Sequence, residues 1–152
     1  MADQVTRRLA FGGLAVNMAA LLFMGTAKPA VGQDAPNHHA HFMKCAKACT
    51  DCQLQCDMCF SHCKDLVTQG KKEYATTMEL CVDCGECCKL AATLSARKSP
   101  LAAEACECCM KACDKCAAAC EKYPNDQHMA DCAKSCRACA ASCKEMLQHL
   151  KH

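Results

Sequence analysis

The cysteines carry the clearest chemistry in this sequence, which has 20 of them among 152 residues. In the stretch CAKACTDCQLQCDMCFSHC, from Cys45 to Cys63, successive cysteines are separated by 4, 3, 4, 3 and 4 positions. Alternating steps of three and four are the a and d positions of a heptad, so these thiols share one face of a helix. Thiolates bind soft metals and take part in redox chemistry. The stretch therefore predicts a helix with reactive sulfur where leucine ordinarily packs.

The same spacing recurs in three later segments of the chain. Heptad phase places 18 cysteines on inward-facing stripes, namely Cys45, Cys49, Cys52, Cys56, Cys59, Cys63, Cys81, Cys84, Cys88, Cys106, Cys109, Cys113, Cys116, Cys120, Cys132, Cys136, Cys139 and Cys143. The other two, Cys87 and Cys108, fall off this phase. Each adjoins an in-phase cysteine, and we expect both to join a widened stripe. The stripes together predict one core filled with thiols.

Four helices must position these stripes, at about residues 41–69, 72–96, 99–123 and 126–150. Gly70 suits the left-handed turn after the first helix. Ser99 and Pro100 suit an N-cap and first helical position for the third, and Asn125 or Asp126 can cap the fourth. Short connections make successive helices antiparallel. The predicted fold class is all-α, an antiparallel up-down-up-down four-helix bundle with a cysteine-lined core over residues 41–152.

A purely structural role for the thiols is the first alternative. Buried cysteine behaves as a small hydrophobe, but leucine fills an a or d position with more apolar volume. Disulfides are the second alternative. Cysteines three or four apart on one helix hold their Cβ atoms about 5 to 6 Å apart, which suits a disulfide poorly. A few bridges between helices remain open, but a small domain needs only two to four.

Pairs such as Cys49 and Cys52 match the C-x-x-C motif of redox and zinc sites. Any heptad stripe of cysteines produces such pairs, and no strand pattern accompanies them as in a thioredoxin-like enzyme. Zinc and iron–sulfur sites require discrete groups of four ligands, whereas these stripes are continuous. The motif therefore does not indicate a redox enzyme or a zinc protein.

Charge favours a monovalent metal. A zinc ion with four thiolates has a net charge of −2, and several such centres in one dry core would repel each other. Cu(I) prefers thiolate and thioether ligands. If each Cu(I) binds two thiolates and each thiolate bridges two ions, the array is neutral and holds about one Cu(I) per cysteine. The sequence thus predicts storage of multiple Cu(I) ions, without enzymatic activity.

Methionines and histidines extend the candidate ligand set at the two ends of the bundle. Met43 and Met146 are expected where the first helix starts, and Met78 and Met129 at the opposite end. Their thioethers could serve as exchangeable ligands, or could simply fill gaps in the core. His41, with His38 and His39, precedes the first helix and could capture copper there. A flexible segment over residues 33–40 is an equal alternative.

The first 32 residues have the layout of an export signal. Thr6, Arg7 and Arg8 form a basic start, an apolar run follows, and small residues lie around Gly32. Paired arginines and modest hydrophobicity favour the twin-arginine route over the general secretory one. A retained transmembrane helix is the alternative. Cleavage would remove three basic residues and one acidic residue from totals of 18 and 16, leaving 15 of each, which gives no basic patch for nucleic acid or membrane.

The stripe from Cys45 to Cys63, the segment CVDCGECCKLAATLSARKSPLAAEACECCMKACDKCAAACEKYP and the closing CAKSCRACAASCKEML resemble the bacterial copper storage proteins. The resemblance covers about residues 41–150. It implies Cu(I) held between pairs of thiolates, access at a methionine-bearing end, and a homotetramer of bundles. The paired arginines resemble those of the exported branch, which implies a periplasmic or internal-membrane location and copper supply to a methane-oxidising enzyme. The cysteine count is closer to that of the cytosolic branch.

Two other functions remain alternatives at this point. One is general detoxification of soft ions such as Ag(I), Cd(II) or Zn(II), which thiolates also bind. The other is a disulfide-stabilised structural or redox protein, the default expectation for an exported chain with an even number of cysteines. The number of metal ions bound and the fraction of free thiols distinguish these functions from copper storage.

Overall fold

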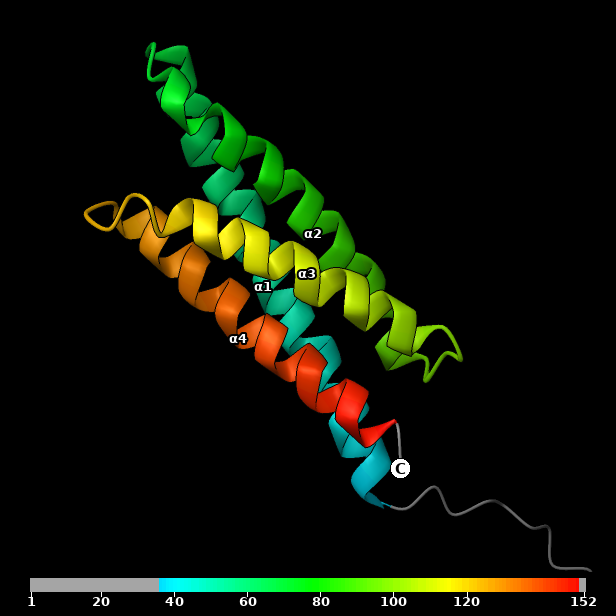
Figure 1. The fold of residues 1–152 in the computed structure, drawn as a ribbon. Helices are drawn as coiled ribbons and strands as arrows, with labels where there is room; N and C mark the ends of the chain where they lie inside the picture. Colours follow the sequence, from blue (N-terminus) through cyan, green and yellow to red (C-terminus); the bar gives the residue numbers. More distant parts are fainter. Residues whose placement is uncertain (1–35, 151–152) are drawn as a thin grey trace, which may run out of the picture. The chain divides into compact units, whose positions relative to one another are not determined.

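The structure is a computed structural model, which describes residues 36–150 of the chain. The helices are α1 (Pro36–Thr68), α2 (Ala75–Ala96), α3 (Ala102–Cys120) and α4 (Gln127–His149), with a 3-10 turn, η1 (Lys72–Tyr74), before α2 (Figure 1). Over residues 36–150 there is no strand, and none of the helices has the length and apolar character needed to cross a membrane. The expected export signal, residues 1–32, lies outside the described residues.

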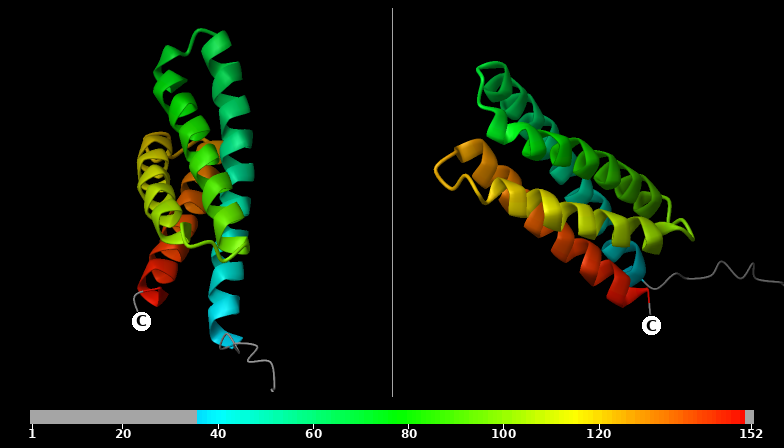
Figure 2. Two further views of the ribbon diagram at one scale, coloured as in Figure 1. Left: turned by 90° about the vertical axis from the view of Figure 1, so that its right-hand side faces the viewer. Right: turned by 45° about the horizontal axis from the view of Figure 1, so that its top comes forward.

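The four helices pack side by side as a bundle. α1 contacts α2 and α4, and α3 contacts the same two helices, so that α1 and α3 are diagonally opposite. Successive helices run antiparallel, and the turn joining α1 to α2 extends beyond the connection between α3 and α4 (Figures 1 and 2). This arrangement confirms the predicted all-α four-helix bundle.

Two helices end in the same hydrogen-bonded motif. After α1, the N–H groups of Gly70 and Lys71 donate to the carbonyls of Val67 and Leu66, and Gly70 has a φ of 91°. This is a Schellman motif, which uses a left-handed residue to satisfy the last carbonyls of a helix. Lys98 takes the equivalent place after α2 with a φ of 51°. The predicted role of Gly70 is therefore confirmed, whereas at Lys98 a side chain occupies the position that glycine prefers.

The starts of the helices differ more from prediction. α1 begins at Pro36, so the helix includes residues 36–40, five residues before its expected start. α3 begins at Ala102, and its N-cap position is Leu101, so the predicted capping by Ser99 followed by Pro100 is wrong. Ser99 Oγ still accepts a hydrogen bond from the Leu101 N–H at 3.2 Å, within the turn that precedes the helix. Prediction placed these starts imprecisely because turns flanking a helix compete with its first turn for the same N–H groups.

Asp126, one of the two predicted candidates, caps α4. Its carboxylate accepts hydrogen bonds from the backbone N–H groups of His128 and Met129 at 3.0 and 3.3 Å, and it also pairs with His62 of α1 at 2.7 Å. Burial raises the pKa of this carboxyl, but the hydrogen bonds from His62 and the two N–H groups outweigh it and lower the pKa overall. Asp126 therefore links the start of α4 to α1.

We expect Asp126→Ala to lower the free energy of unfolding by about 1 kcal/mol, the usual cost of losing an N-cap side chain. In a domain of this size that corresponds to a fall of about 4 °C in the melting temperature, measurable by circular dichroism of the reduced, metal-free protein. Asp126→Asn is the matched control, since asparagine also caps helices, and should cost less. Equal melting temperatures for all three proteins would contradict the capping role.

The core is built from cysteine and alanine instead of large apolar residues. Among the large aliphatic and aromatic side chains from residue 39 to residue 150, only Phe42 and Leu66 are buried, together with Met129 and Met146, whereas Leu54, Leu90 and Leu101 are at least half exposed. The only buried polar or charged residues over residues 39–150 are Thr77, Ser95 and Ser142. No charged side chain of the described bundle thus lies in its core, which constrains what the thiols can bind.

Candidate metal centre

All 18 in-phase cysteines lie in one buried cluster along the bundle axis. Each has an exposed fraction of 1% or less. Thiols from diagonally opposite helices meet, as Cys52 of α1 and Cys113 of α3 do with Sγ atoms 3.9 Å apart, and as Cys84 of α2 and Cys136 of α4 do at the same distance. Sulfur therefore fills the centre of the bundle, and the prediction that these 18 residues face inward is confirmed.

The thiols form groups of four that share members. Within each group all Sγ atoms lie within 4.8 Å of one another, and the groups include Cys49/Cys109/Cys139/Cys143, Cys52/Cys56/Cys84/Cys136, Cys52/Cys84/Cys88/Cys113, Cys56/Cys116/Cys132/Cys136 and Cys59/Cys81/Cys120/Cys132. Cys52, Cys84, Cys56, Cys132 and Cys136 each belong to two of these groups. The first group shares no member with the other four, but the contact of 3.6 Å between Cys109 and Cys88 joins it to them, so the cluster is a continuous array and does not divide into separate four-ligand sites.

None of the cysteines in the described bundle is in a disulfide. The contacts between core Sγ atoms, such as 3.6 Å for Cys84 and Cys113, are far longer than the roughly 2.05 Å of an S–S bond. Cysteines from all four helices take part in such contacts, so the thiols are arranged as mutual neighbours of an array and not as isolated pairs.

The sulfur spacing alone does not decide which metal fits. Four thiolates around zinc, each about 2.3 Å from the ion, would be separated by about 3.8 Å, which is close to the contacts in the core. However, neighbouring groups share sulfur atoms, and the described core has no cationic side chain to offset the −2 charge of each centre. A row of such centres would be costly to bury. A monovalent soft ion with about one thiolate per ion leaves the array neutral.

Hydrogen bonds between sulfur atoms shift the pKa values of neighbouring thiols in opposite directions. The hydrogen bond between Cys109 and Cys113, 3.9 Å long, raises the pKa of Cys113 and lowers that of Cys109. Burial favours a higher pKa at both sites because a thiolate loses its hydration there, but at Cys109 the hydrogen bonds outweigh it and the pKa is lowered overall. Metal binding must replace these shared protons, so loading is coupled to proton release.

The four candidate methionines differ in their access to the core. Met129 and Met146 are completely or almost completely buried, and Met129 Sδ lies 3.6 Å from Cys59 Sγ. Met78 is half-buried and packs against the core cluster, whereas Met43 is 45% exposed. Thioethers from Met129 and Met146 therefore lie beside the thiol array, while Met43 lies outside it.

Histidines lie at both ends of the bundle. His41 is half-buried and stacks on His149, with ring centroids 4.0 Å apart. His39 is exposed, and the side chain of His38 lies outside the described part. At the opposite end, His62 stacks on His128 at 4.4 Å and pairs with Asp126. Sequence reasoning missed His62 and His128, although their positions next to Cys63 and Met129 were a signal.

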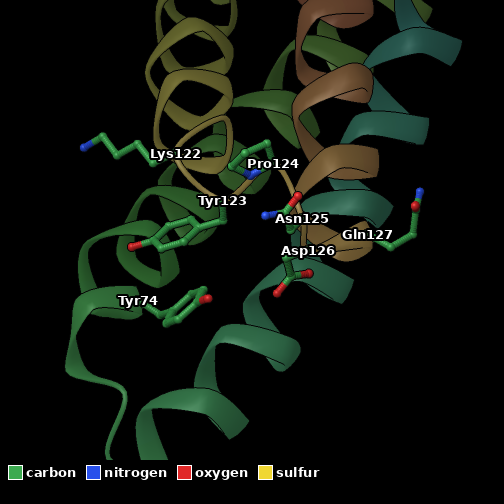
Figure 3. A pocket seen from close by; sticks show the side chains of 7 residues that line it. All are labelled: Tyr74, Lys122, Tyr123, Pro124, Asn125, Asp126 and Gln127. Carbon is green, nitrogen blue, oxygen red and sulfur yellow. The ribbon is translucent and has the colours of Figure 1, made fainter.

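An open pocket of about 590 Å³ lies close to this second end. It is lined by Tyr74, Tyr123, Asp126 and their neighbours (Figure 3). The rings of Tyr74 and Tyr123 stack with centroids 4.2 Å apart, and the Tyr123 hydroxyl donates to the Glu73 carbonyl at 2.7 Å. The pocket lies between the α1–α2 turn and the α3–α4 connection. Because no thiol lines it, it is not part of the metal centre.

Cys87 and Cys108 do not belong to the buried array. Cys108 is exposed and Cys87 is half-buried, and their Sγ atoms are 3.4 Å apart on the outer side of the α2–α3 pair. The expectation that both would join a widened inward stripe is therefore wrong for Cys108, while Cys87 only packs against the edge of the core. Their positions lie about 100° around the helix from their in-phase neighbours, which places them at the seam between helices.

Comparison with known proteins agrees with this site. The family model described as Csp, copper storage protein, matches residues 32–148. The solved structure of the Cu(I)-bound copper storage protein BsCsp3 is 32% identical, with a TM-score of 0.62 over 68% of this chain and 94% of that chain. No curated protein matches at a significant level.

Two solved structures from Streptomyces lividans share the fold. One is of a cytosolic copper storage protein with five coppers, at 21% identity and a TM-score of 0.68, covering 74% of this chain and 96% of that chain. The other is of the copper storage protein Ccsp loaded with 10 copper equivalents. It is 23% identical, with a TM-score of 0.66, and the match covers 80% of this chain and 93% of that chain. With the matching family model and its cysteine-filled core, the chain belongs to the copper storage protein family.

Proposed function

We propose that the 18 buried thiols store Cu(I) at about one ion per thiolate, with each ion bound mainly by two thiolates. The observation that carries this proposal is a buried array of shared thiols in a described core that contains no cationic side chain. Only a monovalent soft ion fills such an array without leaving a large buried charge. The proposed function is therefore storage and not enzymatic catalysis.

Anaerobic titration of the reduced protein with Cu(I) against a competing chelator tests this proposal. We expect saturation near 18 to 20 ions per chain, since the core has 18 thiols and the chain 20. Free thiols should number about 20 before loading and almost none should react after it. Saturation at four ions or fewer would sink the storage proposal, as would freshly isolated protein in which most thiols are oxidised.

Zn(II) provides the matched comparison in this titration. The sulfur spacing suits individual tetrahedral zinc centres, so general soft-metal binding is the second candidate function. If the buried charge determines which metal binds, we expect Zn(II) to fill only a few four-thiol groups that have no thiol in common, and added Cu(I) to displace it. Zn(II) binding at one ion per four core thiols, with resistance to displacement by Cu(I), would favour the second candidate.

The thioethers and histidines are proposed as ligands at the two ends of the array. Met129 and Met146, buried beside the thiols, are the stronger candidates, and Met78 and His41 lie at its margins. Thioethers bind Cu(I) more weakly than thiolates because they carry no charge. They would therefore hold ions that exchange readily at the ends of the array.

Export, assembly and copper delivery form the remainder of the proposal. The paired arginines Arg7 and Arg8 support export by the twin-arginine route, and resemblance to the family supports a homotetramer that supplies copper enzymes. We expect Arg7→Lys with Arg8→Lys to leave the unprocessed precursor in the cytoplasm, as measured by cell fractionation and the mass of the mature chain. Normal processing and export of this variant would contradict the twin-arginine assignment.

A further inference from the structure

The outer pair, Cys87 and Cys108, has a geometry that the storage core does not need. The two Sγ atoms come from different helices and lie 3.4 Å apart, close enough for one metal ion to contact both after small side-chain rotations. Unlike every core thiol, both are accessible to solvent. Reagents that cannot reach the array can therefore reach these sulfurs.

The outer pair directly adjoins a core pair. Cys88 and Cys109 are the next residues along α2 and α3, and their Sγ atoms are 3.6 Å apart in the buried array. Cys88 also contacts Cys113 at 3.7 Å, and Cys109 contacts Cys139 at the same distance. The seam between α2 and α3 thus has one thiol pair outside and one inside, and the inside pair is connected to the rest of the array.

A surface hollow of about 200 Å³ lies beside Cys108 of the outer pair. Its lining includes Cys108, Lys111, Lys115 and Asp83, which gives the hollow a net charge of +1. A Cu(I) ion bound by two thiolates has a net charge of −1. At the surface, water and the two lysines can stabilise that charge, whereas in the core an isolated −1 centre would be costly. The hollow therefore suits an incoming or outgoing anionic Cu(I)–thiolate complex.

We propose that Cys87 and Cys108 form an outer two-thiolate Cu(I) site that exchanges copper with external thiols and passes it through the Cys88–Cys109 pair to and from the core. In uptake, a Cu(I) complex of two external thiolates reacts with the two cysteine thiols. Two Cu–S bonds form and two break, the cysteine protons leave with the two released thiols, and copper stays Cu(I). Release is the reverse. This inference rests on the proposed thiolate binding of Cu(I) in the core.

The test compares the wild-type protein with the Cys87→Ser/Cys108→Ser variant. Both are loaded anaerobically with Cu(I), and glutathione with a colorimetric Cu(I) chelator is added to follow copper removal. We expect the variant to lose about one ion of capacity and to release copper at least fivefold more slowly. In wild-type protein loaded to saturation with Cu(I), mass spectrometry should show both cysteines protected from alkylation.

The Cys81→Ser/Cys116→Ser variant is the matched control, because it removes a buried α2–α3 pair whose Sγ atoms are 3.8 Å apart. It should lose capacity without a comparable slowing of release. Equal release rates for the wild-type protein and the outer-pair variant would overturn the inference, as would full alkylation of the outer pair in loaded protein. So would an outer disulfide in freshly isolated protein. Failure of the storage proposal would give a different result from failure of this inference, because the wild-type protein itself would then bind few Cu(I) ions.

Discussion

Loading the reduced protein with Cu(I) should raise its melting temperature by more than about 30 °C. A ligand present at 1,000 times its dissociation constant stabilises the folded state by about 4 kcal/mol per site. Five such ions already add roughly 20 kcal/mol, which exceeds the total stability of a typical domain. The effect is large here because the metal-free core is packed with small thiols instead of leucine. Circular dichroism of loaded and metal-free protein under anaerobic conditions measures it.

Two comparisons test whether this stabilisation comes from copper bound in the core. The Cys87→Ser/Cys108→Ser variant keeps all 18 core thiols and should be stabilised almost as much as the wild-type protein. Removing the copper with excess chelator should return the melting temperature to its starting value. A rise of less than about 5 °C at full loading would mean that copper does not hold the helices together.

The second large effect is expected from replacing the central group Cys52, Cys84, Cys88 and Cys113 with serine. Serine is close to cysteine in size, but its hydroxyl is a hard ligand that Cu(I) does not favour. These thiols contact others on all sides, as Cys113 does with Cys109 at 3.9 Å. Because each thiolate is proposed to bridge two ions, we expect capacity to fall by more than four ions, with the array divided into two parts. Anaerobic titration measures this loss.

The variant with four serines must first be shown to keep its helices by circular dichroism. The outer-pair variant is again the control, because it removes sulfur outside the core from α2 and α3, two of the three helices that carry the central group, and should lose about one ion. A loss of two ions or fewer from the central replacement, in a folded protein, would show that the middle of the core is not the main store.

The inward position of the 18 in-phase cysteines could be predicted because it depends on the helical repeat alone, whereas the expectation that Cys87 and Cys108 would join them was wrong for Cys108. Steps of three and four put Cys45 through Cys63 on one face wherever the helix lies. Gly70 and Asp126 were also predictable, since each acts through hydrogen bonds to residues nearby in the chain. The helix starts were less predictable. Compared with the expected starts, α1 begins earlier, at Pro36, and α3 begins later, at Ala102.

The sequence by itself thus determined the number of helices, the contents of their shared face and the preference for a soft metal, because these follow from local periodicity and from thiol chemistry. Only the tertiary structure decided which thiols are neighbours, such as Cys52 with Cys113 across the bundle axis. It also brought His62 to Asp126 and His128 and left Cys87 and Cys108 together outside the core. These contacts depend on how the helices are rotated and shifted against one another, which spacing within one helix does not specify.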